Sequence, residues 1–183
     1  MRVTAGMQGF LLSAALLGAA VTQVSAAAPP ADEPIMRLPL PNGNDFPISA
    51  AVKVDAGVDT YYLSGALPQV SNKDAPKGSV ESYGNMETQA TSALESLQST
   101  LQRMGLTMGD VVKMQVFMVA GTDGKLDFAG LMTGYKKFFG TAEQPNKPAR
   151  SAFQVAALVA PGALVEIEVI AAKPHPKAAK RHK

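Results

Sequence analysis

Three charged side chains in the last third of the chain have the types and spacing to bind a small anion. Arg150 stands two positions after Pro148, and Glu166 and Glu168 lie in an apolar segment further on. A guanidinium holds a carboxylate through two parallel hydrogen bonds, so an arginine at the mouth of a strand, near a strand carboxylate, can capture a small anion. The alternative interpretation is an ordinary exposed Arg–Glu pair, which would contribute almost nothing to stability.

The segment that contains these side chains predicts two strands joined by a hairpin. Residues 149–155 and 164–171 alternate with a period of two and contain β-branched residues, and Pro161 with Gly162 supplies the turn between them. In the second strand this period places both glutamates on one face and the valines and isoleucine between them on the other.

The rest of the body predicts three more strands and two helices. The strands are residues 46–54, 60–64 and 111–119, of which the last is apolar enough to lie centrally in a sheet. The helices are residues 83–104 and 127–139, which carry apolar residues at helical spacing, and we expect these residues, Met104 and Phe128 among them, to face the core. The order β-β-α-β-α-β-β indicates an α+β fold with a mixed sheet and both helices on one face. Because no third helix remains for the other face, we expect a partner subunit to cover it.

The two ends of the chain predict appended segments. With 183 residues, 46% of them hydrophobic, the chain fits one globular domain. Residues 1–26 have a basic start, an apolar run and a small-residue site, typical of a cleaved export signal, and the run is too short for a stable membrane anchor. We therefore expect a periplasmic or secreted protein that begins near Ala27. Residues 27–45 predict a Pro/Ala-rich linker and N-terminal extension, followed by the domain at 46–172.

Residues 173–183 predict a basic, disordered tail, because they contain five Lys or Arg and no acid. Without those five and Arg2, 11 basic residues face 15 acidic ones, which is a poor footprint for nucleic acid. The alternative for the tail is binding to an anionic lipid or polymer.

The composition excludes several kinds of catalytic site from the folded body. The chain has no cysteine, and both histidines, His175 and His182, lie in the tail. Sites of the Ser-His-Asp or Cys-His type and His/Cys metal sites are therefore excluded. The sequence also has no phosphate-binding or dinucleotide-binding glycine motif. We expect no metal and no cofactor, and a site of carboxylates, tyrosines, one arginine and backbone groups.

Four segments of the chain resemble the Rid family, the YjgF-type reactive intermediate deaminases. They are YLSGALP (62–68), GLTMGDVVKMQVFM (105–118), FAGLMTGYKKFFG (128–140) and PARSAFQVAALVAPGALVEIEVIAA (148–172). The resemblance covers residues 46–172. It implies a chorismate-mutase-like homotrimer with ligand clefts between subunits, and cofactor-independent hydrolysis of enamines and imines such as 2-aminoacrylate to a 2-keto acid and ammonia.

The resemblance also implies roles for individual residues. Arg150 would hold the substrate carboxylate, and Glu166 would position the attacking water or move its proton. Backbone at Ser64 and Gly65, and near Ala152, would help to hold the imine or the water. An imine is already electrophilic, so orientation and one carboxylate can supply the acceleration needed.

The predicted cleft is less polar than in typical deaminating members. Tyr135, Phe139, Arg150 and Glu166 agree with the family pattern. The departures are Ile48 for a tyrosine, Met132 for an asparagine, Ala152 for a cysteine and Gln154 for a glutamate. They favour bulkier, more apolar imino acids, or a non-catalytic trimer that only binds a small carboxylate. The name "L-PSP endoribonuclease" also follows this family, but the acidic body argues against RNA cleavage.

Overall fold

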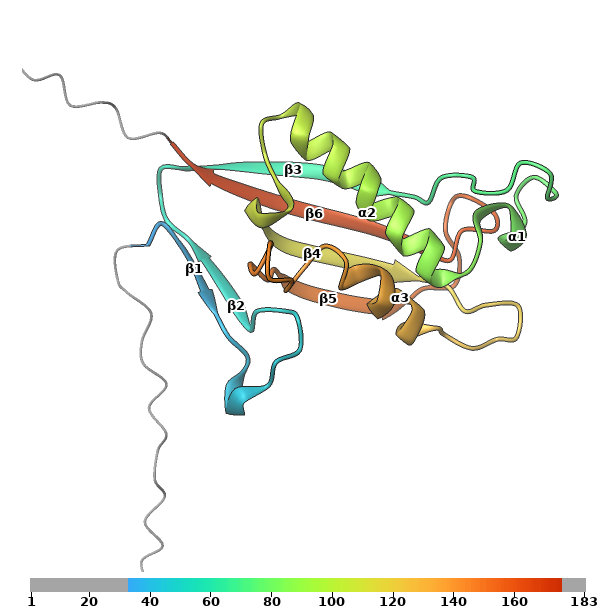
Figure 1. Cartoon of the computed structure of the whole chain (residues 1–183), viewed down its shortest axis with the longest axis horizontal. Helices are drawn as coiled ribbons and strands as arrows, with labels where there is room; N and C mark the ends of the chain where they lie inside the picture. The colour runs from blue at the N-terminus through green and yellow to red at the C-terminus, as the bar shows by residue number, and fades with distance from the viewer. Residues whose placement is uncertain (1–32, 176–183) are drawn as a thin grey trace, which may run out of the picture.

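A four-stranded mixed sheet forms the centre of the structure (Figure 1). The computed structural model describes residues 33–175, and the predicted export signal lies outside them. Across the sheet the strands are β3 (Val58–Ala66), β6 (Val165–Pro174), β4 (Val111–Met118) and β5 (Ala149–Gln154). β6 is antiparallel to both of its neighbours, and β4 is parallel to β5. A smaller antiparallel sheet pairs β1 (Ile35–Leu38) with β2 (Ala51–Val54).

The two predicted helices form as α2 and α3, and each begins at a polar cap. The helices are α1 (Val80–Tyr83), α2 (Met86–Arg103) and α3 (Phe128–Tyr135), with 3-10 turns η1 (Pro41–Gly43) and η2 (Met108–Asp110). Asn85 Oδ1 accepts from the Thr88 N–H at 2.9 Å to start α2, and Asp127 accepts from the Gly130 N–H at 2.7 Å to start α3. α2 ends at Arg103, and Gly105 follows its C-cap with a φ of 72°, which favours glycine.

α2 and α3 lie over one face of the four-stranded sheet (Figure 1), and the hydrophobic core lies between them and that face. The buried residues of α2 are Met86, Gln89, Ala90, Ala93, Leu94, Leu97 and Leu101. They pack with Val165, Ile167 and Val169 of β6, and this confirms the predicted alternation in that strand. Met104, which we expected in the same stripe, is 45% exposed because it caps the end of α2. The α+β class and the helices on one face are thus confirmed.

The predicted hairpin between the last two strands is wrong. β5 and β6 both form, but β4 lies between them in the sheet. The ends of the loop that joins them bond to β4 rather than to each other: the Val155 N–H donates to Met118 O at 2.8 Å, and the Val119 N–H donates to Leu164 O at 2.9 Å. The residue types at Pro161 and Gly162 indicate that the chain reverses direction there. They do not determine whether the two strands pair with each other or with a third strand between them.

The segment predicted as a linker contributes β1, and the first predicted strand shrinks to β2. Arg37 of β1 is half-buried, and its guanidinium donates to the carbonyls of Gly109, Val111 and Lys147 at 2.9–3.0 Å. Burial lowers the pKa of Arg37, and the nearby Asp110 charge opposes this shift. A short apolar strand between prolines carries too weak a signal in the sequence, so its pairing was not predicted.

The last strand extends beyond the predicted domain boundary. β6 runs to Pro174, so the first residues of the predicted tail belong to the sheet. Lys173 Nζ donates to Gly105 O at 2.6 Å, and His175 Nε2 lies 3.1 Å from Asp59 Oδ1. Residues 176–183 lie outside the described part of the chain. Within residues 33–175, no helix has the length and apolar character needed to cross a bilayer.

The second face of the four-stranded sheet carries no helix within residues 33–175. Strand alternation places Tyr62, Phe117, Phe153 and both glutamates of β6 on this face. The rings of Phe117 and Phe153 meet edge to face, with centroids 5.1 Å apart, and Tyr62 is 78% exposed. Aromatic side chains are therefore presented to solvent on a flat surface, which is typical of a surface that another chain covers.

Candidate active site

Arg150 lies near the start of β5 on the face of the sheet that the helices cover. Its guanidinium carbon is 4.5 Å from the ring centroid of Tyr135, 5.4 Å from that of Phe46 and 5.8 Å from that of Phe128. Its Nη1 donates to the Met132 sulfur at 3.3 Å. α3 supplies three of these neighbours, and the loop before β2 supplies Phe46. The cation is thus enclosed by three rings and a thioether.

The charge of Arg150 has no acidic partner among residues 33–175. The ion pairs there join Lys53 to Asp55, Lys137 to Glu87 and His175 to Asp59. Burial lowers the pKa of Arg150, but an arginine starts so high that it stays charged. A thioether is a weak acceptor, so most of the donor capacity of the guanidinium remains for an anion. The exposed Arg–Glu pair, the alternative interpretation of the sequence, is wrong for the protomer.

Tyr135 supports Arg150 with its ring and not with its hydroxyl. The hydroxyl donates to the Pro47 carbonyl at 2.7 Å inside the core, and the ring stacks on Phe139 with centroids 4.9 Å apart. Burial raises the pKa of Tyr135, and the Arg150 charge only partly opposes this, so the phenol stays neutral. Tyr135 therefore provides a cation–π wall and is not placed to move a proton.

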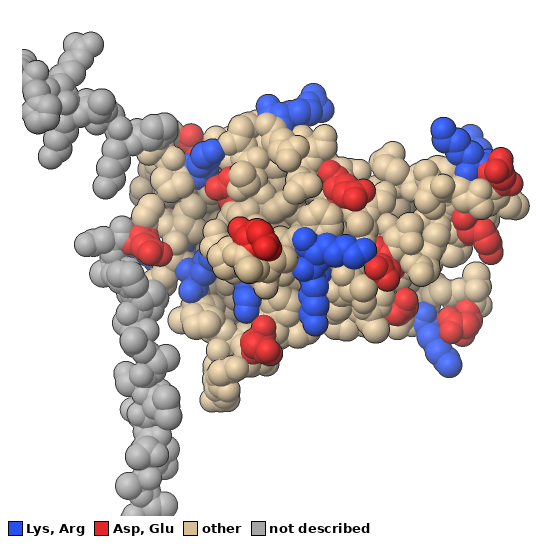
Figure 2. All heavy atoms as spheres, viewed as in Figure 1, with Lys and Arg blue, Asp and Glu red and all other residues tan. Residues whose placement is uncertain are grey.

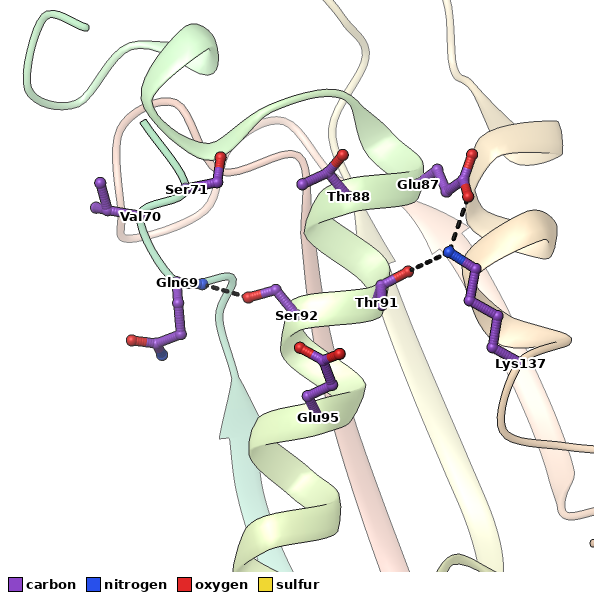
Figure 3. A pocket seen from close by; sticks show the side chains of 9 residues that line it. All are labelled: Gln69, Val70, Ser71, Glu87, Thr88, Thr91, Ser92, Glu95 and Lys137. Atoms are coloured by element: carbon purple, nitrogen blue, oxygen red, sulfur yellow. Dashed lines mark hydrogen bonds and ion pairs between the residues drawn. The ribbon is translucent and has the colours of Figure 1, made fainter. Parts of the chain in front are cut away.

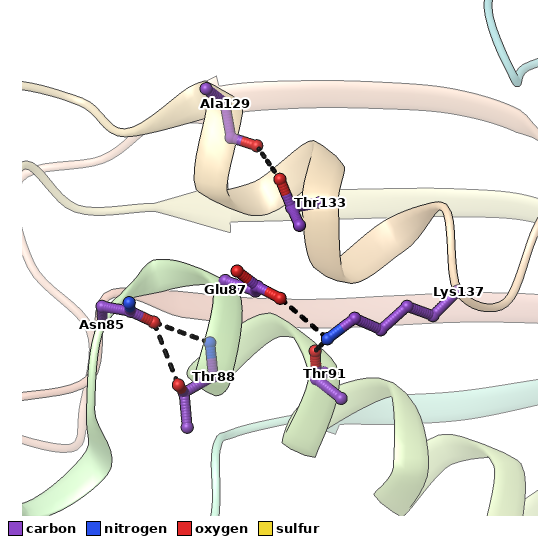
Figure 4. A network of polar contacts seen from close by, with 7 residues as sticks. All are labelled: Asn85, Glu87, Thr88, Thr91, Ala129, Thr133 and Lys137. Atoms are coloured by element: carbon purple, nitrogen blue, oxygen red, sulfur yellow. Dashed lines mark hydrogen bonds and ion pairs between the residues drawn. The ribbon is translucent and has the colours of Figure 1, made fainter.

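A polar network holds α3, which carries the neighbours of Arg150, against α2 (Figure 4). Lys137 Nζ lies 2.8 Å from Glu87 Oε1 and 3.3 Å from Thr91 Oγ1. The two helices approach closely at Gly134, where a Cβ would come within 3.1 Å of Ala90. This contact fixes where Met132 and Tyr135 stand relative to β5.

Glu166 and Gly65 form a second group. β3 contains a β-bulge, because Leu63 pairs with Val169 and Ala66 with Ile167, which leaves two residues of β3 opposite one of β6. The Glu166 carboxylate lies against Gly65, where a Cβ would overlap it. The bulge therefore lies beside the Glu166 carboxylate, and the predicted roles of the Ser64 and Gly65 backbone stay predictions.

The two groups lie on opposite faces of the sheet. Arg150 pairs with Met114 of β4, while Glu166 pairs with Phe117, three positions further along the same strand. An odd offset places side chains on opposite faces, and strand spacings separate the two residues by about 10 Å along the strands and about 10 Å across them. Arg150 and Glu166 of one protomer therefore cannot act on the same small molecule.

Of the remaining predicted site residues, Ala152 lies on the same face as Arg150, and Ile48 lies apart from both groups. Ala152 follows Arg150 on the helix-covered face and packs against the core. Ile48 lines a separate pocket of about 280 Å³, together with Arg37 and Pro145. Phe46 and Phe128 were not predicted as neighbours of Arg150, because the three residues are distant in sequence. Phe128 was expected within the core stripe of its helix, but it is 39% exposed.

A polar pocket of about 410 Å³ on the outer surface of α2 lies apart from both groups (Figure 3). The Gln69 N–H donates to Ser92 Oγ across it at 2.7 Å. Its lining consists of Gln69, Val70, Ser71, Glu87, Thr88, Thr91, Ser92, Glu95 and Lys137. None of the predicted site residues belongs to it.

Comparison with known proteins identifies the family. The family model described as Endoribonuclease L-PSP matches residues 45–173. The mouse protein named 2-iminobutanoate/2-iminopropanoate deaminase is 38% identical over 127 residues, which are 68% of this chain and 80% of that protein. A RutC family protein of Haemophilus influenzae is 39% identical over 85 residues, which are 46% of this chain and 62% of that protein.

A solved structure shows the same fold. A Rid family protein of Yersinia pestis, described as being of unknown function, superposes with a TM-score of 0.56 at 24% identity, over 76% of this chain and 98% of that one. The residues that the family model matches, 45–173, contain β2 to β5, all of β6 except Pro174, α2 and α3, and with them Arg150, Glu166 and the bulge at Gly65. The chain therefore belongs to the Endoribonuclease L-PSP family, which is the YjgF or Rid family that its sequence resembles.

Proposed function

We propose that this protein hydrolyses 2-imino acids and their enamine tautomers to 2-keto acids and ammonia. The observation that carries the proposal is Arg150: a half-buried cation with no acid beside it among residues 33–175. Such a group is stabilised when a carboxylate binds, because the carboxylate supplies the missing charge and two acceptors. The 38% identity to a mammalian protein named as a 2-iminobutanoate/2-iminopropanoate deaminase supports the same reaction class.

The proposed active unit is a homotrimer with its clefts between subunits. Two observations support this assembly: Arg150 and Glu166 lie on opposite faces of one sheet, and the face that carries Glu166 presents aromatic rings to solvent. A neighbouring subunit can cover that face and bring its own Arg150 to Glu166. Light scattering at micromolar concentration tests the assembly, and a monomer mass would contradict it.

In the proposed reaction, Arg150 of one subunit holds the substrate carboxylate, and Glu166 of the neighbour holds a water molecule. The water oxygen attacks the imine carbon, and its proton passes to Glu166. Glu166 passes this proton to the nitrogen, and the hydroxyl group of the resulting carbinolamine releases a second proton, which also reaches the nitrogen. The carbon–oxygen double bond then forms as the carbon–nitrogen bond breaks, and ammonia leaves the 2-keto acid. The imine carbon is already electrophilic, so orientation and one carboxylate are sufficient catalysis.

A second candidate function is binding of a small carboxylate without turnover. The thioether of Met132 and the rings around Arg150 favour it, because they offer few polar contacts to an imine nitrogen.

An experiment that separates the two candidate functions generates imino acids in place with an amino-acid oxidase and follows 2-keto acid release with and without the protein. Acceleration that disappears in Arg150→Ala supports the deaminase. Calorimetric binding of a 2-keto acid without any acceleration supports the binding protein.

RNA cleavage is not part of the proposal, despite the description of the matching family model. On the face drawn in Figure 2, acidic and basic side chains are interspersed. The body has more acidic than basic residues, so it offers little attraction to phosphates.

We further propose that the protein acts after export, in the periplasm or outside the cell. The basic start, apolar run and small residues of segment 1–26 support this location. Mass spectrometry of the protein from its natural compartment should give a chain that begins near Ala27, and a retained Met1 would contradict the proposal.

A further inference from the structure

We infer that the site selects imino acids with a large apolar side chain, and that Phe128 and Met132 make this selection. The inference rests on the proposed function, since it assumes that Arg150 holds the carboxylate. It concerns the side chain of the substrate, which would contact the apolar residues around Arg150.

The neighbours of Arg150 determine what lies next to a bound carboxylate. Within residues 33–175, its guanidinium contacts the rings of Phe46, Phe128 and Tyr135 and the sulfur of Met132. No charged side chain and no hydroxyl there bonds to it, and the Tyr135 hydroxyl points away to a carbonyl. On the side of the cleft that this subunit supplies, atoms of a ligand that extend past its carboxylate therefore meet carbon and sulfur, whereas the neighbour's Glu166 faces the imine carbon in the proposed reaction.

Phe128 and Met132 form one ridge beside the guanidinium. They are four positions apart on α3, so their side chains are neighbours on one side of the helix. Phe128 is 39% exposed although it is a large aromatic residue, whereas Met132 is 8% exposed. The ridge thus has an exposed aromatic end and a thioether inner end, and an apolar substrate side chain would remove the aromatic end from water.

This arrangement distinguishes imino acids by the side chain that is attached to the imine carbon. A methyl group covers little of the Phe128 ring, whereas an isobutyl or benzyl group covers much of it and gains from the contact. A charged substrate side chain would lose its hydration water against these rings and would find no group of opposite charge there. Methionine adapts its shape to such groups better than a shorter, polar side chain can.

The test compares imines made in place by amino-acid oxidases from alanine, leucine and phenylalanine. For the wild-type protein we expect kcat/KM for the phenylalanine-derived imine to exceed that for the alanine-derived imine by about tenfold or more. Phe128→Ala and Met132→Asn should each reduce this ratio several-fold. Met104→Asn is the matched control, because Met104 lies at the exposed end of α2, and it should leave the ratio unchanged.

A wild-type ratio of one or less would overturn the inference while leaving imine hydrolysis intact. A ratio that is unaffected in both Phe128→Ala and Met132→Asn would overturn the assignment to these two residues. If the wild-type protein accelerates none of the imines, the proposed reaction fails, and calorimetry with the keto acids then decides the inference alone. Tighter binding of phenylpyruvate than of pyruvate, lost in Phe128→Ala, supports it, and equal or weaker binding of phenylpyruvate overturns it.

Discussion

Arg150 and Glu166 lie on opposite faces of one sheet, because β4 pairs Arg150 with Met114 and Glu166 with Phe117, three residues apart. Each residue has its own surroundings: rings and a thioether around the arginine, a bulge with Gly65 beside the glutamate. In the proposed reaction both are needed at one substrate, so two protomers must supply them.

Replacing Arg150 should abolish imine hydrolysis. Arg150→Ala removes the cation and should cost about 2–5 kcal/mol of transition-state binding, since the ion pair would be partly desolvated. Arg150→Lys keeps a charge but loses the planar fork, so it should also lose most activity. Stability should change by no more than about 1 kcal/mol, because the lost cation–π contacts are offset by relief of burying the charge. Keto-acid release and thermal melting, measured on the same samples, check both parts, and unchanged hydrolysis would refute the proposed role.

Glu166→Gln should slow turnover and leave carboxylate binding intact. The amide keeps the size of the side chain but cannot accept the water proton. We expect kcat to fall by about 100-fold or more with KM little changed. Glu168→Gln is the matched control, because it removes the same charge from the same face two residues away. Equal losses in both variants would point to a general charge effect and not to a base at Glu166.

Mixed assemblies should regain activity that neither parent has. In a trimer formed from Arg150→Ala and Glu166→Gln subunits, a cleft is intact when the Glu166→Gln subunit supplies Arg150 and the Arg150→Ala subunit supplies Glu166. A trimer that contains both kinds of subunit has one intact cleft of three, so the purified mixed species should show about a third of the wild-type activity. Co-expression with two affinity tags, followed by kinetic assay of the mixed species, measures this. Mixed trimers as inactive as their parents would show that one subunit supplies both residues or neither.

Gly65→Ala should impair turnover through Glu166. An added Cβ would overlap the Glu166 carboxylate, so the carboxylate must move. We expect kcat to fall while Arg150-dependent binding of a keto acid persists. Gly121→Ala serves as the control, since the nearest contact of its Cβ is the end of the flexible Asp123 side chain, 3.3 Å away. A kcat equal to that of the wild type would show that the position of this carboxylate does not matter.

Arg37→Leu should destabilise the fold more than it affects chemistry. The change leaves the carbonyls of Gly109, Val111 and Lys147 without their donor in a half-buried place. We expect a loss of about 2–3 kcal/mol in the free energy of unfolding. Arg103→Leu, at an exposed position in the last turn of α2, should cost less than about 0.5 kcal/mol. Urea denaturation of the two variants compares them, and equal stability would show that Arg37 does not anchor β1.

The sequence alone predicted most of the strands and the two longer helices, and it singled out Arg150 and Glu166 as candidate site residues. Period-two and helical spacing located β3 to β6, α2 and α3 to within a few residues. Alternation also gave the correct faces of β6, because side-chain direction follows local backbone geometry. Arg150 and Glu166 stood out because a charge in an apolar strand costs free energy unless it has a use.

Only the tertiary structure decided which elements are neighbours. β4 entered between β5 and β6, and β1 joined the domain through Arg37, because pairing depends on contacts between residues distant in sequence. The rings of Phe46 and Phe128 met Arg150 for the same reason. The separation of Arg150 from Glu166 followed from strand order and register together. Local patterns specify the direction of each side chain, whereas the packing of the whole chain specifies what that side chain meets.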